Sequence, residues 1–208
     1  MRANTHTYVG EGDDKHGLWE RSFSDRVSLT AFRRRSHMRF KVLMAVMGTL
    51  LTTATIAKAD QIAALLTGYE ESPSVSTTGR GEFTATIAPD GDVIHYTETY
   101  SGLQATVTQS HIHVGQLGVN GSIVIFLCQT ANNPDPTGLA PQCPQEGSVS
   151  GAITAANVIA GATASQQLAA GDLAAVVTAI RAGAAYANVH TTASPGGEIR
   201  GQIRTIAK

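Results

Sequence analysis

The sequence has few aromatic residues, only two cysteines and almost no excess charge. Its 208 residues include 5% aromatic residues and carry a formal net charge of −1. Because nucleic acid and anionic membrane surfaces are bound by strongly basic proteins, this charge argues against both as partners. The 42% hydrophobic residues must form the core largely without rings, and the 21 glycines provide many turns. This composition is typical of a β-rich globular domain.

Common catalytic motifs are also missing. The chain has no Gly-x-Ser-x-Gly nucleophile motif, no His-Glu-x-x-His motif and no glycine-rich phosphate loop. We therefore assign no catalytic residue from the sequence.

The N-terminal residues differ from the rest of the chain. Residues 1–37 are polar and irregular, and we expect them to be an unstructured extension ahead of a start at Met38. Residues 38–59 combine basic residues, an apolar run and the small residues of Ala57-Lys58-Ala59. This pattern predicts a signal peptide cleaved after Ala59, and hence a secreted, periplasmic or cell-surface protein. An uncleaved membrane anchor is the alternative.

The two cysteines are Cys128 and Cys143, and they flank a loop rich in Pro, Asn and Gly. In an oxidising compartment they can form a disulfide that closes about 15 residues, which stabilises the fold by roughly 3 kcal/mol. A role as metal ligands is less well supported, because the close Cys-x-x-Cys spacing is absent.

Alternating and periodic patterns predict mostly strands. Residues 79–88 and 93–100 flank an Asp-Gly turn and predict a hairpin, on which His95 lies on the exposed face. Residues 123–128 are apolar without alternation, which predicts a central strand covered on both faces. Residues 172–182 have helical periodicity, with Asp172 as the N-cap and Gly183 at the C-terminal end.

Histidines are spaced to share strand faces. Residues two apart in a strand point to the same side, so His111 and His113 are neighbours on one face. Near the C-terminus, Asn188 and His190 share a face in the same way. The Ser-Pro-Gly-Gly turn after them leads to Glu198 and Arg200, and we expect this hairpin to present all four polar residues on one surface.

These residues support a metal-site hypothesis. Three imidazoles from His111, His113 and His190, completed by Glu198 or water, would suit Zn or Cu. Asn188 and Arg200 would support them from a second shell. The alternative is that the histidines are purely structural, and that Glu198 and Arg200 form a surface ion pair.

The segments "LTGYEE" near Leu66, "YSGL" at Tyr100, "HIHVG" at His111 and "AYANVHTTASPGGEIRGQI" from Ala185 together resemble the CHRD domain. This module is repeated in chordin and occurs singly in exported microbial proteins. The resemblance covers residues 62–206 and implies that residues 60–208 form an all-β, antiparallel β-sandwich or barrel-like domain. It also implies one short helix before the penultimate strand.

The function implied is an exported binding or structural module with an unknown extracellular or cell-surface ligand. The growth-factor binding of chordin is not transferred, because the cysteine-rich repeats of chordin are absent. A small Cu or Zn metalloenzyme distantly similar to superoxide dismutase is the alternative. Only four histidines follow the predicted cleavage site, so the chain offers one mononuclear site at most; they are His95, His111, His113 and His190.

Overall fold

The computed structural model describes residues 58–206, which form an antiparallel β domain. The strands are β1 (Asp60–Thr67), β2 (Arg80–Ile87), β3 (Ile94–Ser101), β4 (Val107–Val114), β5 (Ser122–Cys128), β6 (Gly147–Ile153), β7 (Ala185–Thr191), β8 (Ile199–Gln202) and β9 (Arg204–Thr205). The helices are α1 (Leu173–Arg181) and the 3-10 turns η1 (Gly68–Glu70), η2 (Ala155–Asn157) and η3 (Ala164–Gln166). The predicted extension and nearly all of the predicted signal peptide lie outside the described residues. Among residues 58–206, no helix is long and apolar enough to span a membrane.

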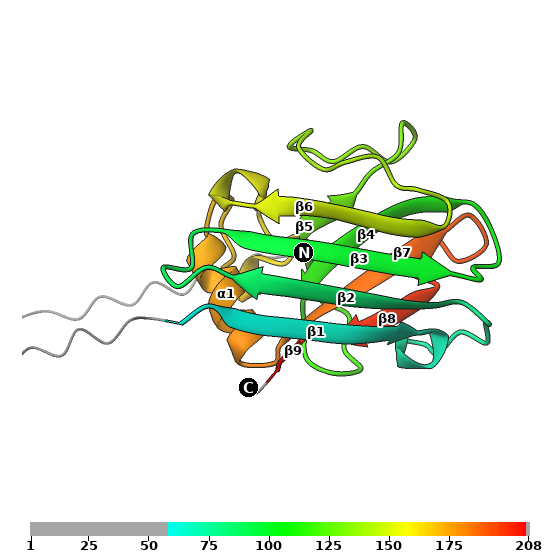
Figure 1. The fold of residues 1–208 in the computed structure, drawn as a ribbon, viewed down its shortest axis with the longest axis horizontal. Coiled ribbons are helices and arrows are strands. Elements are labelled where there is room, and N and C mark those ends of the chain that lie inside the picture. Colours follow the sequence, from blue (N-terminus) through cyan, green and yellow to red (C-terminus); the bar gives the residue numbers. More distant parts are fainter. Residues whose placement is uncertain (1–57, 207–208) are drawn as a thin grey trace, which may run out of the picture. The chain divides into compact units, whose positions relative to one another are not determined.

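The strands follow the order β5-β4-β7-β8-β1-β2-β3-β6, and β9 pairs with β1. Figure 1 shows β1, β2, β3 and β6 in one layer, in front of β4, β5, β7 and β8. The two ends of the path, β5 and β6, contact each other, so the sheet is nearly closed. The all-β, barrel-like fold expected from the sequence is confirmed.

The core follows from the alternation of each strand. In the β2–β3 hairpin, Phe83 and Ile87 point inward with Ile94 and Tyr96, whereas His95 is exposed, as predicted. Inward residues of β1, β4, β7 and β8 complete the same core. The polar residues that alternate with them in β4 and β7 therefore point away from this core.

The strand predicted to be central, β5, is instead at one end of the hydrogen-bonded path. It is buried because other segments cover it. Tyr96 on β3 donates a hydrogen bond to the Leu127 carbonyl at 2.6 Å, and the backbone of Ile159 donates to the Val124 carbonyl at 2.9 Å. An unbroken apolar run reports burial on both faces, and barrel closure provides that burial as well as a central position does.

Helix α1 has the boundaries that its caps predict. The Asp172 carboxylate accepts a hydrogen bond from the Ala175 amide at 2.9 Å, and Gly183 follows the helix with a φ of +68°. Its apolar face is buried and consists of Leu173, Val176, Val177 and Ile180. The helix packs against β7 and delivers the chain into that strand.

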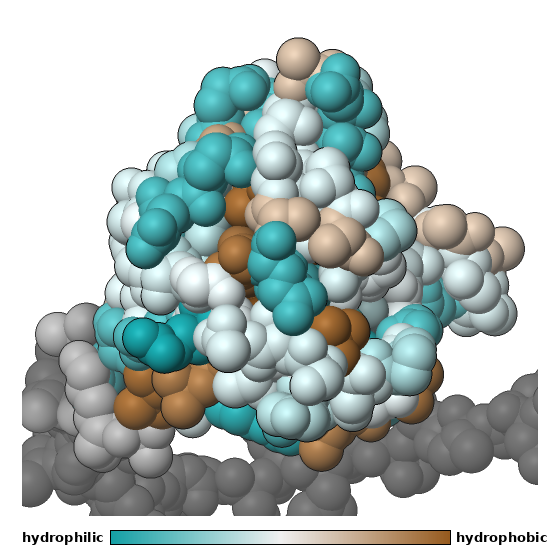
Figure 2. Space-filling view, turned by 90° about the vertical axis from the view of Figure 1, so that its right-hand side faces the viewer, coloured by the Kyte–Doolittle hydropathy of each residue, from teal (hydrophilic) through white to brown (hydrophobic). Residues whose placement is uncertain are grey.

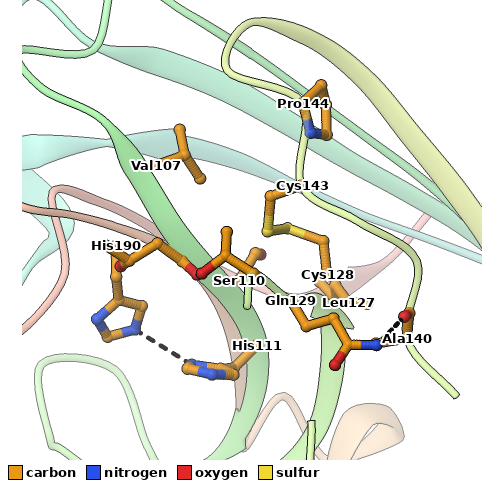
Figure 3. Close-up of a disulfide and its surroundings, with 12 residues drawn as sticks. Val107, Ser110, His111, Leu127, Cys128, Gln129, Ala140, Cys143, Pro144 and His190 are labelled. Carbon is orange, nitrogen blue, oxygen red and sulfur yellow. Dashed lines mark hydrogen bonds between the residues drawn. A yellow bond between two sulfur atoms is a disulfide. The ribbon is translucent and has the colours of Figure 1, made fainter. Parts of the chain in front are cut away.

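The predicted disulfide between Cys128 and Cys143 is confirmed, with 4.9 Å between the two Cα atoms (Figure 3). It joins the end of β5 to the segment that leads to β6. Within the loop it closes, the buried Asp135 carboxylate accepts hydrogen bonds from the amides of Thr137 and Ala140. The disulfide and this carboxylate together order a loop that has little regular secondary structure.

One carboxyl group interrupts the apolar interior. Glu98 on β3 alternates with Tyr96 and Tyr100 on the inward side and is fully buried. Neither carboxyl oxygen has a hydrogen-bond partner of good geometry. Burial raises the pKa of Glu98 to about 8, and the nearby Ser110 hydroxyl opposes this shift. Glu98 is therefore mostly protonated at neutral pH.

Candidate metal centre

The site lies on two paired strands, β4 and β7. Their register places His111 opposite Asn188, His113 opposite Tyr186, and Gln109 opposite His190. Because side chains alternate along each strand, the three histidines share the face that points away from the core, while Ile112 points into it. The predicted meeting of the two histidine segments is therefore observed.

The three imidazoles form a compact buried cluster. One ring nitrogen from each of His111, His113 and His190 lies within 4.8 Å of the other two. His111 Nδ1 is 3.2 Å from His190 Nε2, a contact drawn as a dashed line in Figure 3. The exposed fractions of the three side chains are 0%, 7% and 6% in the same order. Among residues 58–206, this is the one group of three or more His, Cys, Asp or Glu residues with spacing suited to a metal ion.

Backbone carbonyls fix the protons of two rings. His113 Nδ1 is 3.0 Å from the Gly121 carbonyl, and His190 Nδ1 is 2.9 Å from the Pro195 carbonyl. A carbonyl oxygen only accepts, so each Nδ1 carries the proton and each Nε2 of these neutral rings exposes a lone pair. His113 Nε2 is buried without a partner. This arrangement, a ring oriented by a carbonyl with its other nitrogen free, is the one found in histidine metal ligands.

All three histidines favour the neutral form. Burial is the main cause in each case: it lowers the pKa of His113 to about 4, that of His111 well below its usual value, and that of His190 in the same direction. The neighbouring imidazoles lower the pKa of His111 further. Neutral rings keep their lone pairs at physiological pH, as metal coordination requires.

Asn188 extends from β7 to the edge of the histidine cluster. Its Oδ1 is 3.1 Å from His190 Nε2, and its side chain is 2% exposed. On the other side of the amide lies Glu71, which follows η1 and is itself buried. Burial raises the pKa of Glu71 to about 7, whereas Arg200 and the Asn188 amide oppose the increase. The sequence analysis did not identify Glu71, although it belongs to the "LTGYEE" segment.

Arg200 is fully buried and contacts the site through an aromatic ring. Its guanidinium carbon lies 3.4 Å from the centre of the Tyr186 ring, and the His113 ring stacks on Tyr186 with centroids 4.6 Å apart. The two groups would collide on one face of the ring, so Tyr186 is sandwiched between them. Arg200 also donates hydrogen bonds to the carbonyls of Gln116 and Val119. It thereby attaches the β4–β5 loop beside the histidines.

Glu198, the acidic ligand considered from the sequence, is placed differently. Its carboxylate accepts hydrogen bonds from the Thr77 hydroxyl, the Gln104 amide and the Thr191 hydroxyl, at 2.7 to 2.8 Å. It is not one of the clustered residues. The expected surface ion pair between Glu198 and Arg200 is wrong, because both side chains are buried and each bonds to other groups.

The end of the domain that carries η1 and the β7–β8 turn faces the viewer in Figure 2. Hydrophilic and near-neutral residues make up most of this surface, and apolar residues appear in small separate patches. The three histidines are buried and are not part of an exposed surface. Three neutral imidazoles in such a buried position can together hold one Zn or Cu ion.

Comparison with known proteins agrees with the sequence motifs. The family model described as the CHRD domain matches residues 62–203. This range includes all of β2 to β8, and all of β1 apart from its first two residues. No curated protein and no solved structure matches the chain. Because the family match covers most of the sequence, the chain belongs to the CHRD domain family.

Proposed function

We propose that this CHRD domain is an exported binding module whose histidine cluster holds a single Zn or Cu ion. The observation that carries the proposal is the convergence of three buried ring nitrogens that share at most one proton. The Gly121 and Pro195 carbonyls hold the protons of His113 and His190 on the far sides of these rings. Only His111 can then donate a proton into the cluster. A metal ion would satisfy all three lone pairs at once.

Export is the setting that the covalent chemistry supports. A disulfide between Cys128 and Cys143 persists in oxidising compartments and is rare in the reducing cytosol. The predicted signal peptide at residues 38–59 is consistent with the same location. The partner is then an extracellular or cell-surface ligand, and the metal ion would act by stabilising the face that the loops present.

Metal analysis of the purified protein tests this proposal. We expect about one equivalent of Zn or Cu in the wild type, a loss of it in His111→Ala/His113→Ala, and its retention in His95→Ala. The last variant is the matched control, because His95 is exposed on β3 and faces solvent. Removal of the metal with a chelator should lower the melting temperature of the wild type and of His95→Ala. It should leave the melting temperature of His111→Ala/His113→Ala unchanged, because that variant holds no metal.

A wild-type protein that contains no metal and cannot be loaded with Zn or Cu would refute the proposal. The three histidines would then be structural residues that hold β4, β7 and the adjacent loops together.

A further inference from the structure

We infer that the Asn188 carboxamide oxygen is the fourth ligand of the metal ion, and that Glu71 orients this amide. The inference rests on the metal site proposed above. It assigns to the site an N₃O ligand set instead of three histidines and a carboxylate from Glu198.

Two of the distances between the candidate ligand atoms match the edges of a tetrahedral site. Ligands about 2.0–2.1 Å from Zn at tetrahedral angles are separated from one another by about 3.3–3.4 Å. His111 Nδ1 and His190 Nε2 are 3.2 Å apart, and His190 Nε2 and Asn188 Oδ1 are 3.1 Å apart. Two edges of a coordination tetrahedron are therefore already present, and they meet at His190 Nε2.

The contact between Asn188 and His190 favours a cation between the two atoms. His190 Nε2 carries a lone pair, because its Nδ1 proton is donated to the Pro195 carbonyl. Asn188 Oδ1 is also an acceptor, so the two atoms repel each other at 3.1 Å. A metal ion between them converts this repulsion into two coordinate bonds.

Glu71 explains why the amide oxygen points toward the histidines. A Cβ atom on Gly197 would collide with both Glu71 Oε1 and Asn188 Nδ2, so the carboxylate and the amide nitrogen lie on the same side of Asn188. Glu71 Oε1 is buried without a hydrogen-bond partner of good geometry, and a carboxyl oxygen that carries no proton can only accept, so it favours the N–H end of the neighbouring amide. The oxygen end is left facing His190. Glu71 is thus a positioning residue, and it is not one of the clustered residues.

Zinc affinity of the metal-free protein, measured by competition with a chromophoric chelator, tests both roles. Asn188→Leu removes the oxygen, and we expect the Kd to rise by about 100-fold or more. Asn188→Asp keeps an oxygen in place, and its Kd should stay within about tenfold of the wild type. Gln202→Glu is the control for added charge: this amide also lies on the buried face, but it bonds to the carbonyls of Gly115 and Gly183.

The double variant isolates the orienting role. In Glu71→Gln the new amide no longer selects one orientation of Asn188, and we expect the Kd to rise by about tenfold. A carboxylate has oxygens at both ends, so orientation no longer matters in the Asn188→Asp background. Glu71→Gln should therefore have almost no effect there. The melting temperature of each metal-free variant checks that it is folded.

Two results would overturn the inference. If Asn188→Asp binds zinc as weakly as Asn188→Leu, Asn188 is not a ligand. The same holds if the zinc affinity of Asn188→Asp exceeds that of Asn188→Leu only by the gain in affinity that the added charge produces in Gln202→Glu. If Glu71→Gln weakens binding equally in both backgrounds, Glu71 acts through its charge. Either result leaves the metal site itself intact, whereas failure of the metal site appears as a wild-type protein that binds no metal.

Discussion

Replacing Glu98 with Gln should stabilise the protein in a strongly pH-dependent way. The folded state holds the Glu98 proton up to a pKa of about 8, whereas the ordinary value is 4.5. The folded state therefore binds the proton more tightly, so its contribution to stability is complete in acid and is lost as the pH rises through this interval. Each pH unit corresponds to about 1.4 kcal/mol, so by pH 7 the loss is about 3 kcal/mol. Gln is nearly isosteric with Glu and does not titrate.

Urea denaturation of wild type and Glu98→Gln between pH 4.5 and 8.5 measures this effect, with the disulfide intact and metal removed by a chelator. The informative quantity is the difference in free energy of unfolding at each pH, because all other titrating groups, including Glu71, are common to both proteins. We expect this difference to shift in favour of the variant by about 3 kcal/mol between pH 4.5 and pH 7. Most of this change in the free-energy difference should occur between pH 5 and pH 8.

A difference that stays constant with pH would refute the reasoning. It would mean that Glu98 is ionised in the folded protein at a normal pKa, and hence that water or another group solvates its buried oxygens. A constant loss of stability in the variant would instead report only the packing of the Gln amide.

Two other substitutions test the scaffold around the site. Cys128→Ser/Cys143→Ser should lower the free energy of unfolding by about 3 kcal/mol in urea denaturation; a reductant should destabilise the wild type similarly and leave the variant unchanged. Arg200→Lys keeps the charge but loses the planar stack on Tyr186 and the paired bonds to the β4–β5 loop, so we expect a loss of about 2–4 kcal/mol. A loss below about 0.5 kcal/mol would show that a simple cation suffices there.

Local sequence rules predicted much of the fold. The period of two placed His111 beside His113 and set His95 on the exposed side, and the caps at Asp172 and Gly183 delimited α1. Each of these features depends on residues close together in the chain. The pairing of Cys128 with Cys143 was predictable for the same reason, since the two are 15 positions apart.

Features that depend on barrel closure could not be read in this way. The apolar run of β5 indicated burial but not its position at the end of the sheet. Strand parity placed Glu98 beside Tyr96 and Tyr100, but not in a closed interior. Glu71 reaches Asn188 only because η1 packs against β8, and Glu198 finds its hydroxyl partners on distant segments. No local pattern encodes these contacts.

The pairing of β4 with β7 determines when the proposed site can exist. His111 and His190 are 79 positions apart, and the segments between them include β5, β6 and α1. An unfolded or partly synthesised chain therefore holds the two halves of the site apart, and loop-closure entropy opposes their meeting before the sheet forms. The ion would then enter only after the domain has folded, and the metal supply of the compartment in which folding takes place would decide which ion the protein carries.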